Sequence, residues 1–448
     1  MRRTWLLMLT LALSTTALAG RTDGATIAPD EAVRLAIAAA PSLDAQEAST
    51  AQARRDRDVA TVDFVPTLDI SATYTRLSDL DMPPFELGGM VIDSPFKPIL
   101  DNYALKAQVT WPVSDLFLSI APGYRAQRDA WRVQEAALLS ERNTVAREAL
   151  EAYYQLVRVR AGIGVAADGV AVLEAHAVRL DDLFAAGLVT NADVLATRAQ
   201  LADARAQHAE LVGLADVAEA HLAMLLDVDG PLAVDADPAL PTDLPDDSLD
   251  ALVEQALAQR PEVVMLDRLI DVHHHSMVAQ RGAALPHLAV VGNLAYANPT
   301  QRVVPPTAEF FTVWDATVAL TWSPGETAKR LNAAAKARTE ETRARADRER
   351  LVRGVRVEVA QALARVAAAQ RTVEAAGEQV RSADAAFAAQ SDLLAAGNTT
   401  PADVLTAEST ARRARHTLLN ARVDLVVAEV QLDSALGTLV DEPVEGAR

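Results

Sequence analysis

The chain has 448 residues, a formal net charge of −19 and no cysteine, and 50% of its residues are apolar although only 4% are aromatic. This acidic balance excludes a typical nucleic-acid-binding protein, which needs a basic surface. Because there is no cysteine, neither disulfide bonds nor a cysteine-linked lipid anchor can operate, so packing or assembly must supply the stability.

The first nineteen residues have the pattern of a cleaved secretory signal. Arg2 and Arg3 precede an apolar run from Leu6 to Leu13, and an A-x-A cleavage site follows at 17–19. The apolar run is too short to span a bilayer as a helix. We therefore expect residues 1–19 to be removed on export, which takes two arginines away and leaves a net charge of −21 (−19 − 2).

A two-fold internal repeat organises the mature chain. The segments LFAAGLVTNADVLATRAQLADAR (183–205) and LLAAGNTTPADVLTAESTARRAR (393–415) share 11 of 23 positions at a constant offset of 210. A stretch rich in proline and aspartate separates the two copies, as expected of a connector. The expected organisation is repeat 1 over 25–236, a linker over 237–248, repeat 2 over 249–440 and a tail over 441–448.

Long helices are predicted in both copies. Apolar residues recur at alternating spacings of three and four from Val145 to Phe184, and again from Val352 to Leu394 with one break at Gln390. This heptad spacing predicts left-handed coiled-coil packing. A helix over about 125–185 would be roughly 90 Å long, at 1.5 Å per residue. The predicted fold class is therefore mainly α with a small β part, built as a two-fold repeat of long coiled-coil helices.

Four segments of about ten residues alternate instead with a period of two, at about 66–77, 102–113, 286–297 and 311–322. Each has one apolar face and aromatic residues near its ends, which is typical of transmembrane β-strands. The apolar face would meet lipid at Val109 and Val318, and the opposite face would point Gln108 and Thr317 into a lumen. Known membrane barrels begin at about eight strands, and lipid does not tolerate open sheet edges. The strands must therefore belong to a barrel shared between chains.

Each copy also contains a turn between two helices, at 186–193 and 396–403. Each turn has a glycine that can end a helix with a positive φ, followed by a threonine and an aspartate spaced as a capping box. These residues are Gly187, Thr190 and Asp193 in the first copy, and Gly397, Thr400 and Asp403 in the second.

On the tip turns GLVTNADVL (187–195) and GNTTPADVL (397–405), and on the closing SALGTL (434–439), the chain resembles the TolC-like outer-membrane channel proteins. The resemblance covers nearly all of the mature length. It implies a homotrimer with one twelve-stranded barrel and one helical tunnel, embedded in outer-membrane lipid of a Gram-negative bacterium with a long periplasmic extension. The implied partners are a periplasmic adaptor protein and an inner-membrane transporter, and the implied function is passive exit of solutes.

The resemblance also implies roles for the tip residues. Asp403 matches an acid that narrows the closed periplasmic entrance of the family, so Asp403, Thr406 and Asp193 are the candidate gate. Thr406 stands where a second acid is found, and Thr399 replaces an arginine that helps to lock the closed state. Helix capping alone is the alternative role of both aspartates. The candidate docking surface for the adaptor is Gly187, Leu188, Val189, Thr190, Gly397, Asn398, Thr399 and Thr400.

Three consecutive histidines, His273, His274 and His275, could bind a metal ion. On a helix they would point in different directions, so solvated or inter-helix histidines are the preferred interpretation. No catalytic constellation and no metal-ligand spacing stands out, and we expect neither an enzyme nor a cofactor.

The competing interpretation is a soluble periplasmic coiled-coil scaffold, whose strands would form a small globular head. Such a head would have to bury the apolar strand face with its aromatic residues. The outer-membrane channel is therefore preferred. The sequence does not specify whether the cargo is a drug, a metal ion or a protein.

Overall fold

The computed structural model describes residues 26–79, 85–87, 90–92, 99–235 and 248–440. The expected signal, the tail and all but the last residue of the expected linker lie outside these ranges. By its internal contacts the chain divides into two compact units, and each is described by itself. The helical unit contains residues up to 40, 145–244 and 365–431, and the sheet unit contains residues 41–144, 245–364 and 432–448.

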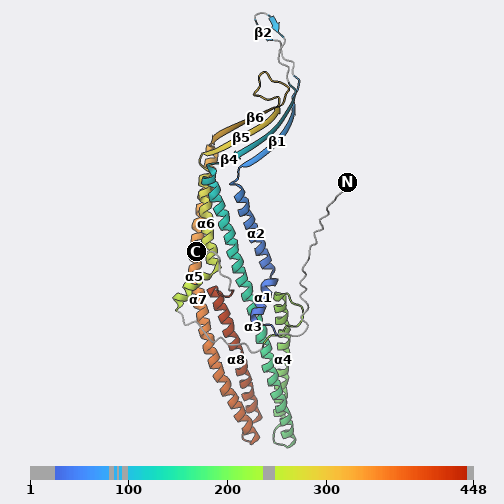
Figure 1. Ribbon diagram of the computed structural model, residues 1–448. Helices are drawn as coiled ribbons and strands as arrows, with labels where there is room; N and C mark the ends of the chain where they lie inside the picture. Colours follow the sequence, from blue (N-terminus) through green and yellow to red (C-terminus); the bar gives the residue numbers. More distant parts are fainter. Residues whose placement is uncertain (1–25, 80–84, 88–89, 93–98, 236–247, 441–448) are drawn as a thin grey trace, which may run out of the picture. The chain divides into compact units, whose positions relative to one another are not determined.

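The helical unit is built from two helix hairpins (Figure 1). In the first hairpin, α3 (Ala121–Ala185) is followed by α4 (Asn191–Leu226), and in the second, α7 (Pro324–Ala395) is followed by α8 (Pro401–Leu436). The unit includes the parts of α3 and α7 next to the turns, and also α1 (Pro29–Ala39). The predicted long helices are confirmed.

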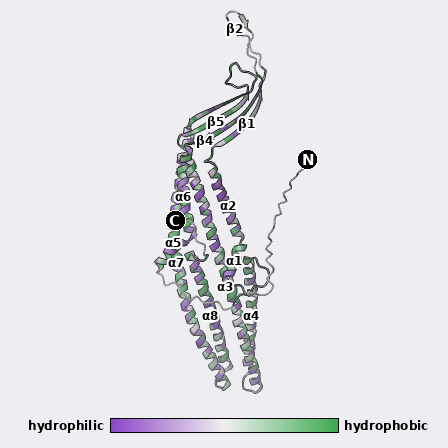
Figure 2. Ribbon diagram, in the orientation of Figure 1, coloured by the Kyte–Doolittle hydropathy of each residue, from purple (hydrophilic) through white to green (hydrophobic). Residues whose placement is uncertain are grey.

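Heptad residues form the core of the helical unit. Leu156, Leu173, Leu180 and Leu222 are fully buried, as expected for a coiled-coil seam. Along the helices, apolar and polar residues are interleaved (Figure 2), because only one stripe of each helix is buried. Phe184, at the end of the predicted seam, is an exception with 45% of its surface exposed.

The N-terminal segment closes one end of this core. Ile27 is buried in the same cluster as Leu156 and Leu222, and its carbonyl accepts a hydrogen bond of 3.0 Å from the hydroxyl of Tyr153. Its amide donates to the carbonyl of Ala233 at 2.8 Å. The two backbone polar groups of Ile27 therefore fix the segment before α1 to α3 and to the segment that follows α4.

The sheet unit contains a four-stranded antiparallel sheet in the order β1-β4-β5-β6. Its strands are β1 (Thr67–Arg76), β4 (Asp101–Trp111), β5 (His287–Asn298) and β6 (Phe311–Thr321), each bounded within two residues of the predicted range. Two further short strands, β2 (Phe85–Leu87) and β3 (Met90–Ile92), pair with each other and were not predicted.

The register separates the two faces of the sheet as the period of two predicts. Val109 of β4 lies opposite Gly292 of β5, and Gly292 lies opposite Ala316 of β6. Val318 is two residues beyond Ala316 on β6, and it lies opposite Val290. Residues opposite each other share a face, so Val109 and Val318 lie on one face and Gln108 and Thr317 on the other. Val318 and Trp314, on the apolar face, are 68% and 72% exposed in the single chain.

Shorter helices join the strands to the rest of the sheet unit. These are α2 (Pro41–Val62), α5 (Leu249–Gln259), α6 (Pro261–Gly282) and a π-helical turn, η1 (Leu116–Ile120), before α3. At Gly282, α6 passes so close to η1 that an added Cβ would lie 1.6 Å from the carbonyl oxygen of Leu118. Only glycine allows this approach.

The histidine triplet lies on α6, and two of its members contact neighbouring helices. Nδ1 of His275 is 3.0 Å from Oδ2 of the buried Asp129, and Nδ1 of His274 is 3.5 Å from Oε1 of the buried Glu341. The inter-helix interpretation is thus confirmed for these two. Among the described residues, no helix combines the length and the apolar character that crossing a membrane requires.

Candidate functional site: the two tip turns

Both tip turns end their first helix in the same way. Gly187 and Gly397 have φ values of 74°, which glycine adopts without strain. The amide of the next residue reaches back to the first helix, from Leu188 to Leu183 at 2.9 Å and from Asn398 to Leu393 at 2.8 Å. This is the Schellman arrangement, and it satisfies carbonyl groups that the helix end would leave free.

Both turns start their second helix with a capping box, as predicted. In the first, the amide of Thr190 donates to Asp193 at 2.9 Å, and the amide of Asp193 donates to Thr190 Oγ1 at 3.3 Å. In the second, the corresponding distances between Thr400 and Asp403 are 3.2 and 3.3 Å. Both aspartates therefore cap helices, whatever further role they have.

The second turn holds its aspartate by one more contact. The hydroxyl of Thr399 lies 3.1 Å from Oδ2 of Asp403 and 2.9 Å from Oε1 of Gln390. Hydrogen bonds from Thr400, and then from Thr399, hold the pKa of Asp403 below its usual value. Asp403 is thus an exposed carboxylate that stays ionised at neutral pH, which is the state that a cation-attracting ring requires.

Of the remaining predicted residues, Leu188, Asn398 and Thr406 are exposed in the single chain, and Val189 is half-buried. Leu188 is 71% exposed, and the hydroxyl of Thr406 is directed to its own helix, donating to the carbonyl of Ala402 at 2.8 Å. Within the described part of the chain, the side chains of Asp193 and Asp403 bond only within their own turns. In the described part of the single chain, the two aspartates therefore make no hydrogen bond to each other.

One ion pair occurs at equivalent positions in both hairpins, and the sequence analysis did not predict it. Arg205 pairs with Glu174 at 2.6 Å in the first hairpin, and Arg415 pairs with Asp384 at 2.9 Å in the second. Both partners are related by the offset of 210 that relates the tip turns (384 − 174 and 415 − 205). Applying this offset to the charged residues as well as to the apolar ones would have found the pair.

At one position the two hairpins differ in charge. Arg198 pairs with Asp181 at 2.9 Å in the first hairpin. The equivalent residues of the second are Glu408 and Ser391, so a buried acid and a serine replace the cross-helix ion pair. Glu408 is 6% exposed, and its nearest charged partner is Arg412, one turn along α8, at 3.4 Å.

Within the described ranges, no group of three or more histidine, cysteine, aspartate and glutamate side chains is arranged to hold a metal ion. The site consists instead of two rigid turns that present backbone, hydroxyl groups and one carboxylate each.

The family model for outer membrane efflux proteins matches residues 32–227 and 252–438, which correspond to the two copies of the repeat. The chain belongs to the outer membrane efflux protein family. Efflux proteins of this family are channels rather than enzymes, and this one is an outer-membrane channel-tunnel that gives solutes a passive exit. This decides between the two interpretations, in favour of the channel and against the soluble scaffold.

Solved structures share the fold of this efflux protein. The outer-membrane channel OprN is 20% identical with a TM-score of 0.75, covering 92% of this chain and 90% of its own. The channel CusC is 17% identical with a TM-score of 0.76, covering 95% of each chain. The MtrE outer membrane channel of Neisseria gonorrhoeae, in its open state, is 18% identical with a TM-score of 0.71, covering 92% of this chain and 89% of its own. A comparison with curated proteins gave no match.

Proposed function

We propose that three copies of this efflux protein form one channel, whose sheets close a twelve-stranded barrel in the outer membrane of a Gram-negative bacterium. The long helices would line a tunnel that extends into the periplasm. A periplasmic adaptor and an inner-membrane transporter would deliver the solutes, and the channel itself would supply neither energy nor chemistry.

The observation that carries this proposal is the pair of free sheet edges. Among the described strands, β1 and β6 each pair on one side only. Every pairing in the sheet is antiparallel, so β1 and β6 run in opposite directions. Joining β6 of one chain to β1 of the next therefore continues the antiparallel order, and closure removes the edges that lipid does not tolerate.

The tips would carry the contacts with the adaptor. We assign this docking surface to Gly187, Leu188, Val189 and Thr190 of the first turn, together with Gly397, Asn398, Thr399 and Thr400 of the second. Both turns are held by the same backbone bonds, so they would present a repeated surface around the tunnel. Asp403 would face the axis as the single acidic ring of the entrance, with Thr406 and Asp193 beside it.

Cysteine cross-linking tests the arrangement, because the natural chain has no cysteine. We expect Ser71→Cys on β1, combined with Val313→Cys or Thr317→Cys on β6, to give cross-linked dimers and trimers in intact membranes. All three residues lie on the polar face of the sheet, so one of the two pairs should bring sulfurs into reach across a β6–β1 junction. Each single variant is the control and should stay uncrosslinked. A protein that remains monomeric in mild detergent and in membranes would remove the proposal.

A further inference from the structure

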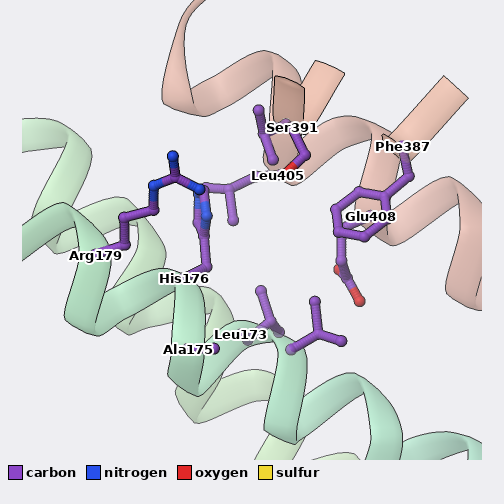
Figure 3. Close-up of a pocket in the computed structure, with 10 residues that line it drawn as sticks. Leu173, Ala175, His176, Arg179, Phe387, Ser391, Leu405 and Glu408 are labelled. Carbon is purple, nitrogen blue, oxygen red and sulfur yellow. The ribbon is translucent and has the colours of Figure 1, made fainter. Parts of the chain in front are cut away.

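A cavity of about 240 Å³ lies in the helical unit, between α3 of the first hairpin and both helices of the second (Figure 3). Its apolar wall consists of Leu173 from α3, Phe387 from α7, and Val404 and Leu405 from α8. A cavity of about 150 Å³ can hold a benzene ring. There is therefore room here for a small organic molecule with one aromatic ring.

Two polar atoms at the cavity lack a partner. Glu408 is more than nine-tenths buried, and its Oε2 makes no hydrogen bond in the described structure. Nε2 of His176, which approaches the cavity from α3 (Figure 3), also makes no hydrogen bond in the described structure. Buried polar groups are nearly always hydrogen-bonded in folded proteins. A carboxylate oxygen and an imidazole nitrogen at one cavity therefore indicate a bound molecule that supplies hydrogen-bond donors.

The surrounding charges leave this carboxylate oxygen available. Arg412 contacts the other oxygen of Glu408, and its Nη1 donates to Gln207 on α4 at 2.8 Å. To reach Gln207 the arginine crosses α3 at Gly169, where an added Cβ would lie 2.6 Å from its Cδ. Arg415 is occupied by Asp384. Arg179, at the rim, is exposed, so solvent and salt screen its charge.

Burial favours the neutral form of both cavity groups. Burial raises the pKa of Glu408, whereas Arg412 and Arg415 lower it. Burial lowers the pKa of His176, and so does the charge of Arg179. A neutral His176 can accept a hydrogen bond at Nε2 when its proton is on Nδ1.

We propose that this cavity binds a small organic cation with a primary ammonium group on an aromatic body. The ammonium group would donate to Oε2 of Glu408, which gives the buried carboxylate oxygen a hydrogen bond. The aromatic body would pack against Phe387 and the leucines, where burial of apolar surface favours it. Water molecules alone would satisfy the polar atoms, but the apolar side chains of the cavity would then stay exposed to water.

The site joins the two copies of the repeat, and this inference rests on the proposed channel. His176 belongs to the first hairpin, and Phe387 and Glu408 belong to the second. A ligand that contacts both hairpins binds more tightly when they are in this arrangement, so its occupancy stabilises the arrangement by linkage. The cavity is thus a place where a small cation could influence the opening of the tunnel from within its wall.

Binding of phenethylammonium to the assembled protein in nanodiscs tests the site. We expect saturable binding at one equivalent per chain, and no saturable binding of the neutral analogue 2-phenylethanol, which lacks the charge. Glu408→Gln should weaken phenethylammonium binding at least tenfold. Glu378→Gln removes an exposed acid from α7 and is the matched control, with affinity unchanged. Empty nanodiscs correct for partition into lipid.

A second variant keeps the test decisive if Glu408→Gln assembles poorly. The double substitution Ser391→Asp with Glu408→Arg recreates the ion pair of the first hairpin and should assemble but not bind the probe. Equal binding of the alcohol, binding that survives both variants, or no saturable binding by the assembled protein would each overturn the site. Bilayer conductance of the same preparations separates the two proposals: a conducting trimer that binds no probe overturns the cation site alone, whereas a protein that forms no trimer overturns the channel assembly.

Discussion

Thr399 donates a hydrogen bond from its hydroxyl to Oδ2 of Asp403 at 3.1 Å, whereas Val189, which has no hydroxyl, occupies the equivalent place beside Asp193. The two tip turns are otherwise closely alike in their backbone bonds. The second carboxylate therefore has one more hydroxyl contact than the first. Both aspartates form the same capping box, so Asp193 can serve as a control for Asp403.

We predict that Asp403→Ala weakens cation selectivity and divalent-cation block of the channel in planar bilayers. Three copies of an exposed carboxylate around a narrow axis would concentrate negative potential and attract multivalent cations. Asp193→Ala removes the equivalent cap without emptying the proposed ring, so it should change both properties clearly less. If the two variants show the same conductance and block, Asp403 is a helix cap and not part of the gate.

We predict that arginine substitutions in the strands separate by face. Val109→Arg and Val318→Arg would place a charge against lipid, at a cost of about 2–4 kcal/mol near the midplane. Gln108→Arg and Thr317→Arg would place it in the lumen and should be tolerated. The amount of assembled protein in outer-membrane fractions measures the difference. Equal losses in both pairs would mean that the apolar face does not meet lipid.

We predict that Gly282→Ala destabilises the sheet unit by about 1–3 kcal/mol or more, because the added methyl group meets the backbone of Leu118 and not a movable side chain. Gly164→Ala, in the interior of α3 with open space around it, should instead stabilise the protein by about 1 kcal/mol through helix propensity. Thermal unfolding of the detergent-solubilised protein measures both. A shift of the same sign in both variants would contradict the close approach.

We predict that Asp129→Asn lowers the free energy of unfolding by about 1–3 kcal/mol, because the buried carboxylate accepts from Arg128 at 2.8 Å and contacts His275 at 3.0 Å. His273→Gln is the control, since in the described part of the chain His273 makes no such contact. Denaturant titrations of the two variants should differ clearly. Similarly small effects of Asp129→Asn and His273→Gln would show that the contact between His275 and Asp129 contributes little to stability.

We predict that His176 makes the protein less stable at mildly acidic pH. Burial and Arg179 lower its pKa, so the unfolded chain binds the proton more readily than the folded one. The stability contribution is therefore full above the unfolded pKa of about 6.5 and is lost as the pH falls from there through the lowered pKa of the folded state. His176→Gln should remove this loss in thermal unfolding between pH 8 and 5.5, whereas His221→Gln, at an exposed position, should keep it. An unchanged pH profile in His176→Gln would contradict the assignment.

Local patterns in the sequence predicted much of this fold. In helices, the heptad spacing of apolar residues indicates which side is apolar, and it depends on neighbours three and four residues away. In strands, the alternation of apolar and polar residues does the same with neighbours two residues away. The long helices, the four strands and the separation of Val109 from Gln108 followed from that alone. The capping boxes at Thr190 and Thr400 were also readable, because a cap is a contact within one turn.

The breaks between short helices were not predicted. Pro41 and Pro261 stand at equivalent places in the two copies, and each begins a new helix after α1 and α5. A proline can occupy the first turn of a helix but not its interior, so the signal was present in the residues. The short β2–β3 pair carries too few residues for a periodicity to appear.

The sequence by itself determined the class of the protein, its repeat and the faces of its helices and strands, because these depend on spacing along the chain. Only the tertiary structure decided which polar groups meet between residues far apart in the chain. His275 contacts Asp129 across 146 residues, and Glu408 lies beside a cavity that its counterpart Arg198 does not share. Such contacts depend on which helix packs opposite and in what rotation. That is set by the packing of the whole chain, so no local pattern records it.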